Sequence, residues 1–212
     1  MRSVPHEKCW AKTTRDGLPG INVEQHNRTA GLVAEALAKL FGKSITRSLG
    51  VDHVPILAAV HDTGKVAPGF LQQCPSWVNL HGFKPHEMAG LETDHGKISQ
   101  TSTFRALGNV SNLRLWAAVV GAHHGKLKGD RVQPRADGGP EWEAERQRLI
   151  QTMITEFGNL PEHPPQSFNC AELWFAAGMI SVADWLASDE RTFPADQPMS
   201  REEISKRVDA LV

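Results

Sequence analysis

The sequence is poor in cysteine and lacks the features of a secreted protein. Its three cysteines, at positions 9, 74 and 170, are far apart and include no C-x-x-C pair. We therefore expect no disulfide framework and a reducing, cytoplasmic compartment. The opening residues also lack the charged and then apolar plan of a signal peptide, because a proline and polar or charged residues occupy positions 5–8.

Long apolar runs and an excess of one charge are missing as well. The longest apolar run is too short to cross a bilayer, so no membrane partner is expected. The formal net charge is −1, so overall charge does not indicate a nucleic-acid-binding protein. Hydrophobic residues make up 40% of the 212 positions, which is enough for the core of one domain. We expect a single soluble domain over residues 1–212.

No segment alternates apolar and polar residues convincingly, as a half-buried strand does. Apolar residues instead recur at helical spacing, which predicts an all-α fold. Asn22 and Ser200 are predicted N-caps, and Gly42 and Gly125 are predicted to end helices. The segment 170–188 is apolar on nearly every side, which predicts a central buried helix. The predicted helices cover residues 23–41, about 52–62, 66–73, 97–107, 113–124, 141–157, 170–188 and 201–212, and residues 74–86 are predicted to form a loop.

Histidine is abundant, and one His-Asp pair stands at a predicted helix end. His61 and Asp62 follow an apolar run and precede Gly64, which lets the backbone turn. Together they offer an imidazole nitrogen and a carboxylate oxygen to one point, a donor set that hard or borderline divalent metals accept. An exposed, solvated pair is the alternative. Lys65 adds a positive group that could hold a phosphate or a leaving oxygen, or it is an ordinary surface lysine.

A second pair, His123 and His124, comes directly before Gly125. Adjacent helical residues point about 100° apart, because a helix has ~3.6 residues per turn. The two imidazoles can therefore serve one metal only if the helix ends there, as the glycine indicates. They could instead face two neighbouring metals, or cap the last carbonyls of the helix.

Asp184 stands out because the segment around it is apolar. A buried carboxylate without a partner is costly, and a shifted pKa or a bound cation is the usual remedy. A local cap, or a surface position on a helix less buried than predicted, is the alternative. His26 and His95 are weaker candidates, since a lone histidine on an apolar stripe is more often a core residue. His86 competes with His95 for the same role.

In chain order these donors read His, His-Asp, His, His-His and Asp, which is the ligand order of the HD metallohydrolase superfamily. The segments 61–65, 121–125 and 183–188 resemble the HD nuclease domain of the CRISPR-associated helicase–nuclease of type I systems. The opening Trp10-Ala11-Lys12 followed by Gln25-His26 is similar to the start of that family. The resemblance covers about residues 8–190 and is weakest over 74–110. Residues 191–212 would be a C-terminal tail or the start of a linker to a helicase.

The resemblance implies an HD-domain helical bundle around a metal site that hydrolyses DNA, mainly in single strands. Asp62 and Lys65 would be catalytic, with Lys65 neutralising a phosphate oxygen. Members of the family bind one or two divalent metals, and histidine-rich ligation favours Mn, Fe, Co, Ni or Zn over Mg. The implied ligands are His26, His61, Asp62 and Asp184 for a first metal, with Asp62 bridging to a second metal held by His95, His123 and His124.

The same resemblance implies an ATP-dependent helicase as partner and, through it, the CRISPR RNA-guided targeting complex. No G-x-x-x-x-G-K-[ST] motif occurs here, so the chain is either a separately encoded nuclease or the front of a longer protein. Two other functions stay open: an HD phosphohydrolase acting on a nucleotide or cyclic dinucleotide, and a catalytically silent HD module.

A basic segment directly follows the second histidine pair. Its positive residues stand among glycines and prolines, which predicts an exposed loop. We expect this loop to contact the backbone of a DNA strand through salt-sensitive electrostatic contacts. A solvated surface loop without a ligand is the alternative. The basic residues are Lys126, Lys128, Arg131 and Arg135.

Overall fold

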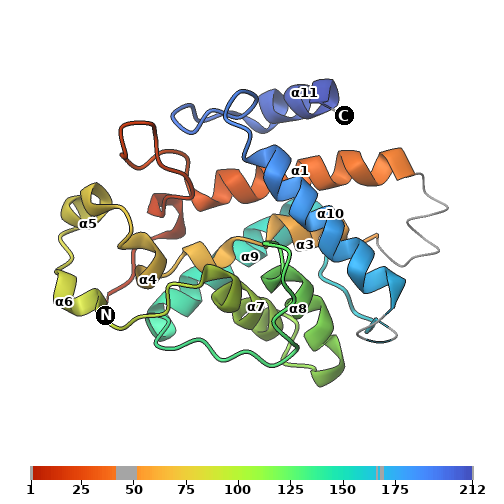
Figure 1. The fold of residues 1–212 in the computed structure, drawn as a ribbon, viewed down its shortest axis with the longest axis horizontal. Coiled ribbons are helices and arrows are strands. Elements are labelled where there is room, and N and C mark those ends of the chain that lie inside the picture. Colours follow the sequence, from red (N-terminus) through yellow and green to blue (C-terminus); the bar gives the residue numbers. More distant parts are fainter. Residues whose placement is uncertain (1, 42–51, 166, 168–169, 212) are drawn as a thin grey trace.

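Helices account for the regular structure of this chain. The computed structural model describes residues 2–41, 52–165, 167 and 170–211. Helix α1 (Val23–Phe41) is covered by several other helices, and α3 (Val54–Ala59) packs against it. Helix α10 (Ala171–Ala187) crosses α1, and α11 (Arg201–Leu211) also packs on α1 (Figure 1). The C-terminal helices α10 and α11 thus pack on α1, the first long helix of the chain.

The middle of the chain builds the other side of the bundle. Helix α7 (His95–Ala106) packs against α8 (Arg114–Gly121), and α9 (Pro140–Phe157) packs against α3 and α7. Three short helices precede them, namely α4 (Pro68–Leu71), α5 (Pro75–His81) and α6 (Pro85–Met88). Short 3-10 turns lie at His6–Lys8, Thr63–Lys65 and Ser111–Leu113. Extended pairing within the described ranges is limited to isolated bridges, so the all-α prediction is confirmed.

The predicted caps explain where two helices begin. The Asn22 side-chain oxygen accepts a hydrogen bond from the backbone N–H of Gln25 at 2.8 Å, at the start of α1. At the start of α11 the Ser200 hydroxyl accepts from the N–H of Glu203 at 3.2 Å, while the Glu203 carboxylate accepts from the N–H of Ser200 at 2.7 Å. This reciprocal pair satisfies two N–H groups that the helix itself leaves free. The predicted end at Gly42 lies outside the described residues.

Two predicted helices are shorter than expected. The helix predicted over 52–62 covers only Val54–Ala59, because the N–H of His61 bonds to the carbonyl of Ala58 in a tighter turn. His61 and Asp62 therefore project from a turn beyond the helix. The helix predicted over 113–124 ends at Gly121, so His123 and His124 also lie past a helix end.

The loop predicted over residues 74–86 is wrong. Pro75 and Pro85 each stand in the first turn of a short helix, where a proline costs no hydrogen bond, instead of breaking one. Gly82, with a φ of +66°, ends α5 in the left-handed conformation that glycine adopts easily. The helix predicted over 66–73 is likewise reduced to Pro68–Leu71.

Helix α10 is not buried on every side as predicted. Trp174, Val182 and Trp185 are 50%, 39% and 65% exposed, so one face of this helix is an apolar surface. The opposite face packs on α1, α3 and α8 and carries the buried Asp184. Apolar composition alone did not separate these two faces. Among the described helices, none is both long enough and apolar enough to cross a membrane.

Candidate metal centre

Four predicted donors meet at the centre of the bundle, although they are far apart in sequence. His26 lies on α1, Asp184 on α10, and His61 and Asp62 on the turn after α3. All four are buried, and each offers one ligand atom within 4.8 Å of the others. His26 Nε2 lies 3.1 Å from Asp62 Oδ2 and 3.2 Å from Asp184 Oδ1. We call these four residues the first donor set.

Three further histidines form a second donor set beside the first. His95 stands at the start of α7, and His123 and His124 follow α8. The Nε2 atom of His95 lies 3.3 Å from that of His123 and 2.9 Å from that of His124. His123 is fully buried and His124 is exposed, so this set faces the surface. His86 is exposed and belongs to neither set.

Asp62 stands between the two sets and presents one oxygen to each. Its Oδ2 atom lies 3.1 Å from His26 Nε2 and 3.4 Å from His61 Nε2. Its Oδ1 atom lies 3.3 Å from His95 Nε2 and 3.4 Å from His123 Nε2. A carboxylate in this position can bridge two cations, one in each set.

Backbone hydrogen bonds fix how two of the imidazoles present their nitrogens. The Nδ1–H of His61 donates to the carbonyl of Ala58 at 2.7 Å, and that of His123 donates to Val120 at 2.8 Å. Each contact is to the carbonyl three residues earlier, which the turn after each helix brings under the ring. The Nε2 atoms are thereby turned to the centre, as expected for histidines that bind a metal.

Gly64 allows the segment carrying Asp62 to approach α7 closely. A Cβ at this position would lie 2.0 Å from the carbonyl oxygen of His95 and 2.6 Å from the N–H nitrogen of Ser99. The N–H of Gly64 instead donates to the Ser99 hydroxyl at 2.8 Å. A side chain here would therefore push apart the two donor sets that Asp62 joins.

The polar atoms at the centre fit divalent cations. His61 Nε2 and Asp62 Oδ1 are buried and, among the described residues, have no hydrogen-bond partner. The three Nε2 atoms of the second set face one another, and they cannot all carry a proton at these distances. A cation in each set would satisfy these atoms, and the imidazole and carboxylate donors suit transition metals such as Mn, Fe, Co, Ni or Zn.

The charges around the first donor set shift its proton equilibria strongly. Burial alone would lower the pKa of His61, but Asp62 and Asp184 outweigh it and raise this pKa to about 10. Burial also opposes the charge of Asp62, yet Lys65 and His61 hold its pKa well below the usual range. Burial lowers the pKa of His123 to about 3, with the charge of His61 contributing. The carboxylates are therefore ionised and His123 is neutral, as metal binding requires, whereas His61 would have to release its proton when a metal binds.

Lys65 is less accessible than a phosphate-binding role suggests. Its side chain is buried, and its ammonium lies 2.5 Å from Asp62 Oδ2 while donating to the carbonyl of Ala11 at 3.3 Å. It therefore contributes positive charge beside Asp62, and little of it faces solvent.

The predicted basic loop, residues 126–135, contains exposed and half-buried residues and none that is fully buried. Lys126, Arg131 and Arg135 are exposed, whereas Lys128 forms an ion pair with Asp94 at the start of α7. Three of the four basic residues are thus placed at the surface.

Sequence reasoning missed a second ionic cluster, near the N-terminus. Buried His6 lies 3.2 Å from Glu24, 3.6 Å from Glu145 and 3.8 Å from Glu7. Arg28 also donates to Glu24 at 2.8 Å. The cluster ties the first residues to α1 and α9. Only the charged character of positions 6 and 7 hinted at it.

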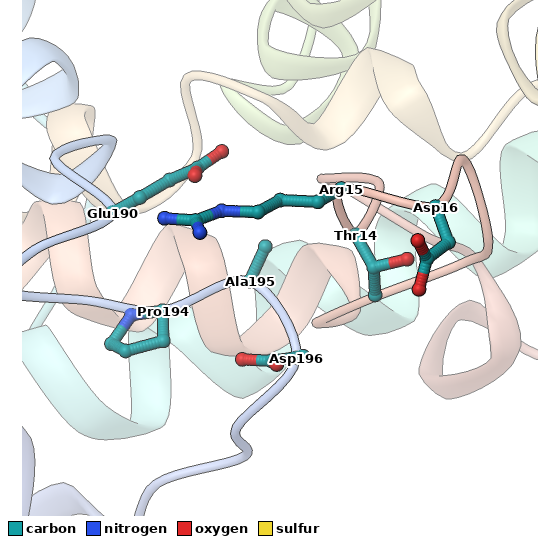
Figure 2. A pocket seen from close by; sticks show the side chains of 7 residues that line it. All are labelled: Thr14, Arg15, Asp16, Glu190, Pro194, Ala195 and Asp196. Carbon is teal, nitrogen blue, oxygen red and sulfur yellow. The ribbon is translucent and has the colours of Figure 1, made fainter.

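A cavity of about 410 Å³ lies between the loop before α1 and the segment after α10 (Figure 2). Arg15 extends across it, and Asp16, Glu190 and Asp196 are also in its wall. Three carboxylates against one guanidinium disfavour a DNA strand there. None of the seven metal-site donors lines this cavity.

Comparison with known families decides how this arrangement is classified. The family model described as Cas3, HD domain, matches residues 10–193. The chain belongs to this Cas3 HD family. The match covers the first donor set, the second donor set and the loop that carries Trp10. The resemblance predicted from the sequence is thus confirmed.

Solved structures support the fold of this Cas3 HD chain. The Thermus thermophilus cas3 HD domain in the presence of Ni²⁺ is 22% identical, with a TM-score of 0.63 over 96% of this chain and 87% of that one. T. fusca Cas3 with ATP is 21% identical, with a TM-score of 0.68 over 97% of this chain and 26% of that one.

A CRISPR RNA-guided surveillance complex in a pre-nicking state contains a similar chain. It is 21% identical, with a TM-score of 0.68 over 97% of this chain and 28% of that one. The present chain therefore spans about a quarter of the length of the longer Cas3 structures. No curated protein matches it.

Proposed function

We propose that this Cas3 HD chain is a metal-dependent nuclease that hydrolyses DNA phosphodiester bonds, mainly in single strands. The observation that carries the proposal is Asp62, which presents one carboxylate oxygen to each of two adjacent donor sets. Two divalent ions held there would supply an activated water and stabilise charge on the attacked phosphate. We infer type I CRISPR interference as its setting, with an ATP-dependent helicase domain or subunit as partner. We expect it to act in the cytoplasm.

The protein's own residues would divide the work as follows. His26, His61 and Asp184 would hold one ion and His95, His123 and His124 the other, while Asp62 bridges them. Lys65 would act by lowering negative charge beside Asp62, because its ammonium contacts that carboxylate. The exposed His124 marks the side from which a phosphate could approach. Residues 1–212 would form one HD nuclease domain, with 191–212 as a C-terminal tail or the start of a linker to a helicase.

The test compares substrates with the same loaded protein. Circular single-stranded DNA and a panel of nucleotides and cyclic dinucleotides are each incubated with Mn²⁺, Ni²⁺ or Co²⁺. We expect cleavage of the circular DNA, which would show that the enzyme does not need a free DNA end. Asp62→Ala should lose cleavage but keep the helical circular dichroism spectrum of the parent. Turnover of nucleotides alone would favour a small-molecule phosphohydrolase instead. Cleavage retained in Asp62→Ala would contradict the assignment.

The basic loop is proposed to bind the DNA backbone. Lys128 is paired with Asp94 at the start of α7, so replacing it would also disturb the second donor set. The sharper variant replaces Lys126, Arg131 and Arg135 with glutamine. We expect weaker DNA binding and a shallower salt dependence, with metal content unchanged. Equal DNA affinity in the variant and the parent would reject this role for the loop.

A further inference from the structure

The loop before α1 places a lysine next to the first donor set. Lys12 lies between two isolated bridges, Trp10 with Asn22 and Thr13 with Pro19, and its carbonyl accepts from the N–H of Gly20 at 2.9 Å. The indole N–H of Trp10 donates to the carbonyl of Leu71 at 3.3 Å. The base of this loop is therefore fixed against the bundle.

A short chain of hydrogen bonds links this lysine to a proposed metal ligand. The Lys12 ammonium donates to the Ser188 hydroxyl oxygen at 2.7 Å. The Ser188 hydroxyl in turn lies 3.2 Å from Asp184 Oδ1. Ser188 follows Asp184 by four residues at the end of α10, so one helical turn brings the hydroxyl over the carboxylate.

The chemistry of the groups fixes the direction of this chain. An ammonium has only donors, so the Ser188 oxygen must accept from Lys12. Its single proton is then free for Asp184, which is an ionised acceptor. The oxygen that receives this proton, Oδ1, is the one that lies 3.2 Å from His26 Nε2 and 3.3 Å from His61 Nε2. The hydrogen bond therefore holds the Asp184 carboxylate with this oxygen toward His26 and His61.

We propose that Lys12 is a positioning residue for the first donor set, acting through Ser188 to hold Asp184 toward His26 and His61. The inference rests on the proposed function only in requiring that a metal binds there. Groups that orient a metal ligand in this way typically change metal affinity or activity by about 10- to 100-fold when removed. Lys12 and Ser188 are half-buried, so neither replacement opens the core.

The test is a double-mutant cycle read as metal affinity. Mn²⁺ binding is measured by calorimetry for the parent, Lys12→Met, Ser188→Ala and the double variant. Lys39→Met, which removes an exposed lysine of α1, is the matched control. We expect each single replacement to weaken the tighter Mn²⁺ site about 10- to 100-fold. The double variant should be no weaker than the poorer single one, because both break the same chain. Lys12→Arg should restore part of the affinity.

Several results would overturn the proposal. Losses that multiply in the double variant would show that Lys12 acts independently of Ser188. A raised KM for single-stranded DNA in Lys12→Met alone, with Mn²⁺ affinity unchanged, would make Lys12 a phosphate contact instead. If none of the variants changes Mn²⁺ binding, the positioning role of Lys12 and Ser188 is rejected while the proposed function is unaffected. A parent protein that binds no metal would reject both.

Discussion

A single carboxylate links the two halves of the proposed centre. Because Asp62 faces both donor sets, Asp62→Ala should lose bound metal from both, whereas His124→Ala should lose it mainly from the second set. His124 is exposed and contacts only the second set, so its removal leaves the first set intact. Metal content per chain, measured by mass spectrometry after desalting, distinguishes the two variants. Equal metal content in both variants would argue against a bridging role.

His6 gives the molecule a pH dependence away from that centre. Burial alone would lower its pKa, but the hydrogen bond to Glu24 and the carboxylates of Glu7 and Glu145 outweigh burial and raise the pKa. A raised folded-state pKa means that the stabilisation is full below the unfolded value of about 6.5 and is lost as pH rises through the folded value.

His6→Gln should therefore destabilise the protein more at pH 5.5 than at pH 9. Urea unfolding in EDTA at both pH values measures the difference, with His163→Gln as a control histidine outside the cluster. A loss of stability that is the same at both pH values would show that folding does not raise the pKa of His6.

At the scale of elements, two glycines should respond in opposite ways to replacement by alanine. Gly178 lies in the middle of α10, and a Cβ there would meet nothing within 4 Å. Gly178→Ala should therefore stabilise the protein by about 0.5–1 kcal/mol, the usual gain of alanine over glycine inside a helix. Gly64→Ala should destabilise it, because its Cβ would clash with the backbone of α7. Chemical denaturation of both variants measures the contrast, and stabilisation by Gly64→Ala would contradict the close approach.

The elements also show what the sequence could and could not predict. The long helices 23–41, 141–157 and 170–188 were found because their apolar period persists over many residues. Residues 74–86 were missed because Pro75 and Pro85 start short helices, and a proline reads equally as a breaker or as a first-turn residue. The exposed face of α10 was missed because composition does not reveal which apolar side chains meet a partner.

The donors themselves were found through their order and through family resemblance, since spacing alone cannot place residues 26 and 184 in contact. The partners that orient them were not. Lys12 and Ser188 stand in segments that resemble the family, but the sequence does not show that their side chains meet, because they are 176 positions apart. The backbone carbonyls of Ala58 and Val120 acquire their roles only when the turns form.

At the scale of the whole molecule, metal binding should stabilise the fold. A ligand that binds only the folded protein contributes about 2.7 kcal/mol when its concentration is 100 times its Kd. Mn²⁺ or Ni²⁺ should therefore raise Tm and EDTA should lower it. Asp62→Ala serves as the control, because its Tm should respond little to either. If neither addition changes the Tm of the parent protein, no ion binds preferentially to its folded state, which would contradict the proposed centre.

The contact between His26 and Asp184 spans 158 positions of the chain. An ion bound by both residues would cross-link the N-terminal and C-terminal parts of the polypeptide. If a protease cut the loop 126–135, the two fragments would then remain associated. Removing the ion would weaken that association.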